Sequence, residues 1–101
     1  MRLNMGCKQE FCIIPPDNRY SNVRYPGLER NEIFGGANRQ RSIKDGLVVY
    51  LTPEQHRTGK YSFHLAPNEW IWLKKLAEET WCEYYNKTKE DFIKEYGKNY
   101  I

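Results

Sequence analysis

Two strand-like runs and a strong helix start follow one another between Leu28 and His64, and this order restricts the fold more than any other feature of the sequence. Residues 28–34 alternate weakly in polarity, which is typical of a short strand that presents polar groups on both faces. Residues 47–51, Leu-Val-Val-Tyr-Leu, are apolar and β-branched, which predicts a buried strand. We therefore expect a β–loop–β–α unit over residues 28–64.

The connection between the two strands is predicted to be a glycine-rich basic loop over residues 35–46. Gly35-Gly36 ends the first strand and lets backbone N–H groups approach a ligand closely. Asp45-Gly46 is a tight-turn signal directly before the second strand.

A short helix is expected to begin after the second strand. Thr52 is the predicted N-cap, Pro53 occupies the first helical position, and Gln55 completes a capping box. His56 then lies in the first turn. His64 follows eight residues later, in a stretch predicted to be extended or irregular, so both histidines of the chain fall at the end of the unit.

Residues 67–97 are predicted to form two scaffold helices. Asn68 is the expected N-cap of the first, and the second is predicted to begin at Thr88, with Asp91 in a capping box, and to end at Gly97. The first helix has a broad apolar stripe at three- and four-residue spacing, formed by Ile71, Leu73, Leu76, Ala77, Thr80, Trp81, Tyr84 and Tyr85. Charged side chains fall mostly opposite this stripe: Lys74, Lys75, Glu78, Glu79 and Glu83.

A chain of 101 residues has the length of one domain, which we expect to span residues 1–101 with an α+β fold. Residues 1–27 are the least defined part, although Phe11–Ile14 could form a short strand. The sequence contains neither an apolar run of membrane-spanning length nor the apolar core of a secretory signal, so we expect a cytoplasmic protein without membrane contact.

Three cysteines cannot all pair within one chain, and reduced thiols are the expectation for a protein without an export signal. Cys7 and Cys12 have a C-x4-C spacing that is loose for zinc, and no second cysteine pair completes four ligands. A degraded zinc knuckle is the alternative for this pair. Cys82 is expected to be a small apolar residue of a helix.

The net charge of +3 is concentrated in one segment. Residues 24–60 contain seven basic and four acidic side chains, whereas the two signs cancel over the rest of the chain. Clustered Arg and Lys suit a phosphate backbone, and a solvated loop with ordinary surface charges is the alternative. The basic residues of the segment are Arg24, Arg30, Arg39, Arg41, Lys44, Arg57 and Lys60.

The same segment contains the ligand types of a metal-dependent hydrolase. Asn31 and Glu32 lie on the first strand, His56 on the helix and His64 beyond it. A divalent ion needs ligands from two or three places, and Glu32 or a histidine could deprotonate the attacking water. Two histidines are an ordinary number for this length, so a structural role for each is the competing interpretation.

The segment resembles the HNH, or ββα-metal, endonucleases, and in particular a group of small phage and prophage proteins of this type. Those proteins contain E-R-H-[HE]-[IV]-F-x-G-x-x-N-R, then S-x-K-x-G-L-x-V-x-L-C-x-x-H-H, an apolar helix and a final G-[RK]-N-Y-[IL]. The resemblance covers roughly residues 28–101. The matching residues are Glu29, Arg30, Glu32, Ile33, Phe34, Gly36, Asn38, Arg39, Ser42, Lys44, Gly46, Leu47, Val49, Leu51, His56 and 97–101.

The resemblance implies a ββα-metal core over residues 28–64 with two C-terminal helices. It places a first-strand metal ligand at Asn31, the general base at Glu32, a helix ligand at His56 and a further histidine at His64. Glu32 and His56 are the implied catalytic residues. The chain departs from the pattern at Asn31, where His or Asp is expected, at Gln55, where a first helix His often stands, and at Thr52, where a Cys often stands.

The function implied by this resemblance is metal-dependent hydrolysis of DNA phosphodiester bonds, with possible inactivation at Asn31. An amide oxygen suits Mg²⁺ or Mn²⁺ and is a poor ligand for Zn²⁺ or Ni²⁺, so Mg²⁺ or Mn²⁺ is the expected cofactor, with Zn²⁺ or Ni²⁺ as the alternative. A non-catalytic phage protein on the same fold, which binds nucleic acid or a host protein, is the second hypothesis. The expected DNA contacts are Arg30, Arg39, Arg41, Lys44 and Arg57.

Overall fold

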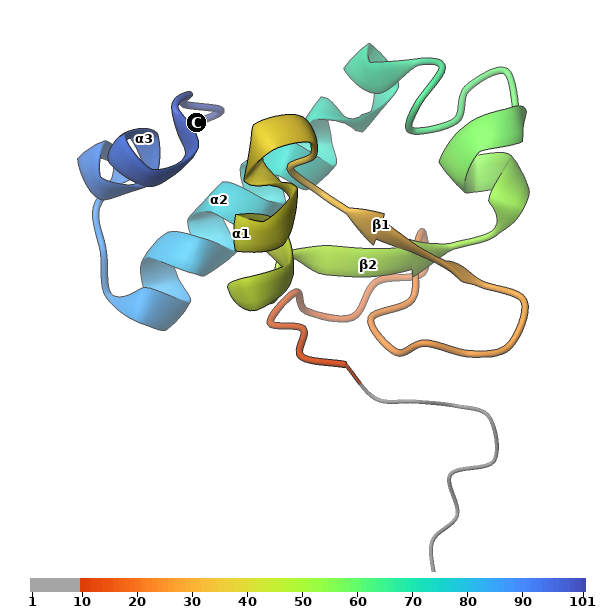
Figure 1. Cartoon of the computed structure of the whole chain (residues 1–101), viewed down its shortest axis with the longest axis horizontal. Helices are drawn as coiled ribbons and strands as arrows, with labels where there is room; N and C mark the ends of the chain where they lie inside the picture. The colour runs from red at the N-terminus through yellow and green to blue at the C-terminus, as the bar shows by residue number, and fades with distance from the viewer. Residues whose placement is uncertain (1–9) are drawn as a thin grey trace, which may run out of the picture.

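The computed structural model describes residues 10–101, which form a mixed α+β fold around a small two-stranded sheet (Figure 1). Cys7, and with it the C-x4-C pair, lies outside the described residues. No helix in the described part of the chain is long and apolar enough to cross a membrane. The elements are β1 (Glu29–Glu32), η1 (Gly36–Asn38), α1 (Arg39–Lys44), β2 (Val48–Leu51), η2 (Glu54–Thr58), η3 (Pro67–Trp70), α2 (Ile71–Tyr85) and α3 (Lys89–Tyr96).

The two predicted strands pair antiparallel, with Glu29 opposite Leu51 and Glu32 opposite Val48. On the other edge of β2, Ser21 and Tyr50 exchange two backbone hydrogen bonds of 3.1 and 2.8 Å. The N-terminal segment therefore covers the outer edge of the sheet. The strand suggested for Phe11–Ile14 does not form.

The predicted basic loop over residues 35–46 is wrong, because most of it is helical. The run Arg-Gln-Arg-Ser-Ile-Lys of α1 consists mainly of good helix formers, and this local preference outweighs the flanking glycines. Ser42 fixes the helix to the sheet by donating to the Leu47 carbonyl (2.7 Å) and accepting from the Phe34 N–H (3.2 Å). At Gly46, φ is +81° and an added Cβ would lie 2.9 Å from the Phe11 ring, so only glycine fits this turn.

Two of the three predicted helix starts are confirmed. The Thr52 hydroxyl accepts the Gln55 N–H (3.1 Å) and the Gln55 side chain accepts the Thr52 N–H (3.0 Å), as a capping box requires. Thr88 caps α3 in the same reciprocal way, with Asp91 as its partner. Asn68 is not an N-cap, because the 3-10 turn η3 begins one residue earlier, at Pro67, and leads directly into α2.

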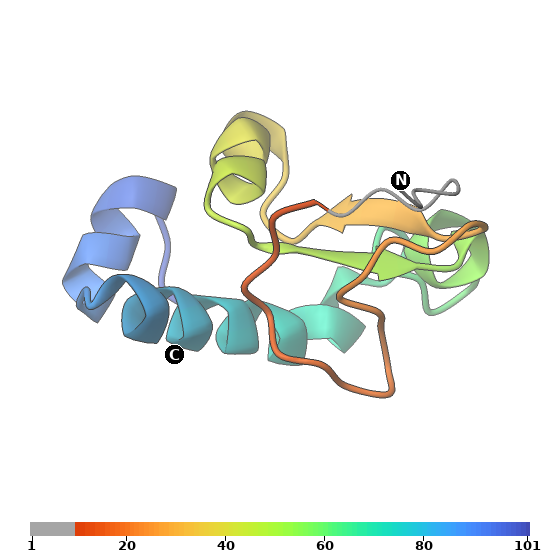
Figure 2. The same ribbon diagram turned by 90° about the horizontal axis from the view of Figure 1, so that it is seen from below.

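The core lies between the sheet and α2, which runs below the sheet in Figure 2. Leu73, Ala77 and Trp81 of the predicted stripe are buried, together with Val49 and Leu51 of β2. The stripe is narrower than predicted, because Ile71 and Tyr84 are 39% and 57% exposed.

Glu78 lies in the interior, although the helical pattern placed it opposite the stripe. Its Oε1 accepts the backbone N–H of Tyr100 at 2.6 Å, and its Oε2 has no hydrogen-bond partner among residues 10–101. The C-terminal tail packs over this part of α2, and burial raises the pKa of the Glu78 carboxyl.

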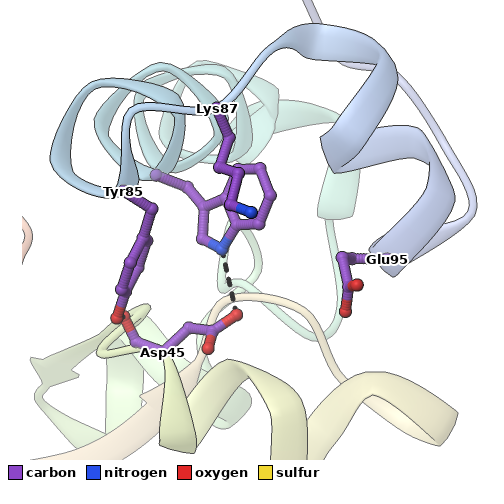
Figure 3. A pocket seen from close by; sticks show the side chains of 5 residues that line it. Asp45, Tyr85, Lys87 and Glu95 are labelled. Carbon is purple, nitrogen blue, oxygen red and sulfur yellow. Dashed lines mark hydrogen bonds between the residues drawn. The ribbon is translucent and has the colours of Figure 1, made fainter.

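Asp45 joins α1 to both C-terminal helices. Its Oδ2 accepts the indole N–H of Trp81 (3.0 Å), drawn as the dashed line in Figure 3, and the hydroxyl of Tyr96 (2.8 Å). Its backbone carbonyl accepts the hydroxyl of Tyr85 (3.0 Å). One turn residue thus orients three aromatic side chains of α2 and α3.

Replacement of Asp45 by Ala is expected to lower the free energy of unfolding by about 3 kcal/mol, because two buried donors lose a charged acceptor. Glu95→Ala is the matched control. Glu95 lines the same pocket (Figure 3) but only pairs with Arg41 at the surface, so its loss should cost less than about 1 kcal/mol. Urea unfolding followed by tryptophan fluorescence measures both, and equal effects would contradict the role of Asp45.

Replacement of Glu78 by Gln should become more stabilising as pH rises. The folded chain holds the Glu78 proton more tightly than the unfolded chain, so the native protein loses stability as pH rises from the ordinary pKa of 4.5 through the raised value. Gln cannot ionise and avoids this loss. Thermal unfolding of both proteins from about pH 4 to about pH 8 measures the difference, and a difference that is constant over this range would contradict the burial of the charge.

Candidate metal and nucleic-acid site

The two histidines of the chain come together at one end of the sheet. The Nε2 atoms of His56 and His64 are 3.1 Å apart, and their ring centroids are 4.7 Å apart. Two backbone hydrogen bonds fold the second histidine back onto η2: Phe63 N–H to the Gln55 carbonyl (2.8 Å) and His64 N–H to the His56 carbonyl (3.1 Å). The capping box before His56 fixes the first turn from which this contact is built.

Glu29 orients the first ring of the pair. Its Oε1 lies 2.9 Å from His56 Nδ1, and its two oxygens also accept a bidentate pair of hydrogen bonds from Arg57 (2.9 and 2.8 Å). Arg57, and then His56, hold the pKa of the Glu29 carboxyl at about 2. A carboxylate that accepts the Nδ1 proton leaves the lone pair of His56 on Nε2, directed toward His64.

His64 is exposed, and the net effect of its surroundings is to lower its pKa, which favours the neutral imidazole. Burial of part of the ring lowers its pKa, His56 and Lys74 lower it further, and the charge of Glu32 opposes them. A neutral imidazole can present a lone pair to a cation. In the structure the two Nε2 atoms share a hydrogen bond, in which one ring donates and the other accepts. A bound cation would replace that proton and take a nitrogen from each ring, as a bidentate pair.

Asn31 is the least explained polar residue of the structure. It is fully buried on the same face of β1 as Glu29, opposite Val49, and neither its amide nitrogen nor its oxygen has a hydrogen-bond partner in the described chain. An unpaired buried amide costs about 1–3 kcal/mol, so the fold gains nothing from it. The unpartnered side-chain oxygen of Asn31 therefore belongs to the same strand as Glu29, which contacts His56.

The nitrogens of His56 and His64 and the oxygen of Asn31 are ligand types that divalent cations accept, but they are fewer than a full coordination sphere. Two imidazole nitrogens suit Zn²⁺, Mn²⁺ or Ni²⁺, and the Asn31 oxygen is a donor that Mg²⁺ and Mn²⁺ accept. Among residues 10–101, no group of three or more His, Cys, Asp or Glu side chains is arranged to hold a metal ion. The unpartnered oxygen of Asn31 is the further side-chain donor that the sequence predicts for such a site.

Glu32, the predicted base, lies on the opposite face of β1 from Asn31. It pairs with Arg30 (2.9 Å) and Arg39 (3.4 Å), and 17% of its side chain is exposed. The structure gives no hydrogen bond between Glu32 and either histidine, although its charge acts on His64. Of the four sequence-predicted site residues, the structure brings only the two histidines into contact. They lie at the Glu29–Leu51 end of the sheet, whereas Glu32 pairs with Val48 at the other end and Asn31 lies between, buried opposite Val49.

The predicted DNA contacts are largely paired with carboxylates. Arg30 contacts Glu10 and Glu32, and Arg39 and Arg57 pair with the strand carboxylates described above. Arg41 pairs with Glu95 and lies over the ring of Tyr96. Lys44 is exposed at the end of α1 and has no ion pair within the described residues. These side chains would have to exchange partners to bind phosphate.

Sequence reasoning missed two residues of this region. Glu29 is part of the motif that the chain resembles, but the motif assigns it no role. Its position two residues before Asn31 on an alternating strand places both side chains on one face, and this spacing could have identified it. Lys74 approaches His64 from α2, and no spacing in the sequence predicts that approach.

We compared the chain with models of protein families, with curated proteins and with solved structures, and none of the three comparisons gave a match.

Replacement of Asn31 by Leu should raise the free energy of unfolding by about 1–3 kcal/mol, because an apolar side chain of similar volume removes an unpaired buried amide. The Ser42→Ala variant is the control for a buried polar group that has partners, and it should be destabilised. Chemical unfolding measures both. A Leu variant that is less stable than the parent would show that the Asn31 amide stabilises the fold.

Proposed function

We propose that this protein is a metal-dependent DNA endonuclease of the ββα-metal (HNH) type. The observation that supports this most directly is the His56–His64 pair, whose Nε2 atoms are 3.1 Å apart while Glu29 holds the Nδ1 side of His56. A carboxylate behind a histidine is the usual outer support of a metal-binding imidazole.

The proposed chemistry assigns a separate task to each candidate residue of β1, η2 and the segment after η2. His56, His64 and the oxygen of Asn31 would hold the cation, which when bound supplies Lewis-acid stabilisation of charge on the phosphate. Glu32 is the candidate general base: it would take a proton from the water that attacks phosphorus, while the P–O bond to the leaving oxygen breaks. His64, as a neutral imidazole, is the alternative base.

The donor set also indicates which ions to test first. Mn²⁺ accepts both imidazole nitrogen and amide oxygen, whereas Mg²⁺ prefers the oxygen and Zn²⁺ or Ni²⁺ the nitrogens. We therefore propose Mn²⁺ or Mg²⁺ as the working ion, with Zn²⁺ and Ni²⁺ as alternatives. DNA is the proposed substrate because the basic excess of the chain lies in residues 24–60, the segment that also contains Asn31, Glu32 and His56.

A second candidate function is that of a non-catalytic phage protein on the same fold, which binds nucleic acid or a host protein. The full burial of Asn31 favours it, because a fully buried amide is closed off from solvent ions, and an amide here stands where the proteins that the chain resembles have His or Asp. Under this proposal the histidine pair is a remnant of a catalytic site.

Substitution of His56 by Ala should lower plasmid nicking at least about 100-fold, because it removes one of two nitrogen donors and the group that Glu29 orients. The measurement is conversion of supercoiled to relaxed plasmid with Mn²⁺ or Mg²⁺, next to Mn²⁺ affinity by calorimetry. Lys75→Gln, on the exposed face of α2, is the matched control and should nick like the parent.

The Asn31→His variant decides between the two candidate functions. Nicking by parent and variant would make Asn31 a working oxygen ligand, and nicking by the variant alone would make the natural chain an inactivated nuclease. Unchanged nicking by His56→Ala would overturn the assigned site. Absence of nicking by both the parent and the Asn31→His variant would leave the non-catalytic function.

A further inference from the structure

The ammonium group of Lys74 lies near the His56–His64 pair. It lies in the first turn of α2, partly buried, with its Nζ 5.3 Å from the centroid of the Phe63 ring and 5.8 Å from that of the Tyr100 ring. The Phe63 ring packs edge-on against His64, with 5.5 Å between ring centroids. One aromatic side chain therefore separates the ammonium group from the exposed histidine.

A second ammonium group lies on the same C-terminal ring. Lys98 Nζ is 5.3 Å from the Tyr100 centroid, so Tyr100 contacts both cations. Neither lysine forms an ion pair with a carboxylate in the described part of the chain. Burial lowers the pKa of Lys74, and the charge of Lys98 lowers it further.

The tail that carries Lys98 is held in place. The Tyr100 N–H is bound by Glu78, as described above, and the Tyr100 ring packs against Phe34 with 5.4 Å between centroids. Phe34 lies two residues after the end of β1, so the tail is fixed between the end of the first strand and α2. Lys98 is thus presented by an anchored backbone.

Neither carboxylate described around the two lysines forms an ion pair with them in the described chain: Glu78 is buried and accepts the Tyr100 N–H. Glu32 pairs with Arg30 and Arg39 on the other side of the strand. Two like charges around one ring repel each other, and an anion placed between them would relieve that repulsion.

We propose that Lys74 and Lys98, positioned by Tyr100, form a binding site for a phosphate of the nucleic-acid backbone beside the His56–His64 pair. This inference rests on the proposed function, since it supplies the phosphate contact that the paired arginines of β1 and η2 do not offer. Lysine ammonium groups bind phosphate as point charges and need no fixed fork geometry.

The test is DNA binding without cleavage. Fluorescence anisotropy of a labelled duplex is measured in chelator, from about 50 to about 200 mM salt. Lys74→Gln and Lys98→Gln should each weaken binding about 3- to 10-fold and reduce the salt slope by about one. Lys75→Gln, one residue away on the exposed face of α2, should leave both quantities unchanged, and Lys74→Arg should retain most of the affinity.

Two outcomes would overturn the inference: equal affinities of the Lys74→Gln, Lys98→Gln and Lys75→Gln variants, or no binding of duplex DNA by the parent at the lowest salt. Circular dichroism melts of each variant separate loss of a contact from loss of the fold. The proposed nuclease function is tested separately by nicking. If the parent nicks DNA but all three Gln variants bind it equally, the nuclease function stands and the lysine site is wrong. If the parent binds DNA through Lys74 but does not nick it, the lysine site stands and the nuclease function is wrong.

Discussion

The register of β1 against β2 is the constraint on which the rest of the site depends. Because Glu29 pairs with Leu51, the first residue of one strand lies beside the last residue of the other, directly before the Thr52 cap of η2. That pairing brings the Glu29 carboxylate to His56. A slip of one residue would turn Glu29 and Asn31 to the other face of the strand and remove the support of the imidazole.

The two faces of β1 have different environments, and this separates the functions that the strand can serve. On one face Asn31 is fully buried and Glu29 binds His56 and Arg57 of η2, whereas on the other face Glu32 pairs with Arg30 and Arg39. A strand of four residues with an apolar partner could have been apolar on its inner face. The buried amide in that place is a cost to the fold that a structural explanation does not account for.

Local signals predicted the elements well, and contacts between distant segments account for most of what the sequence did not reveal. Both strands and both capping boxes depend on neighbouring residues, and the structure confirms them. The helix α1 is not predicted because Gly35, Gly36 and Gly46 flank its segment and are typical of a loop. The helix preference of the six residues of α1 nevertheless determines the structure there. The burial of Glu78 and the approach of Lys74 to His64 both depend on residues far away in sequence, Tyr100 and Phe63 among them, which no periodicity within α2 contains.

The buried Asn31 amide and the Lys74–Lys98 pair are each unfavourable without a ligand, and ligands of opposite charge would stabilise them. The unpaired Asn31 oxygen would be stabilised by a cation, to which the hydrogen-bonded histidine pair offers nitrogen ligands, whereas the ammonium groups of Lys74 and Lys98 would be stabilised by an anion. A phosphodiester beside a divalent ion satisfies both requirements at once, because the ion and the lysines would share the charge of one phosphate. A protein partner that engaged only the aromatic helices would relieve neither, and for this reason we propose a nucleic-acid substrate.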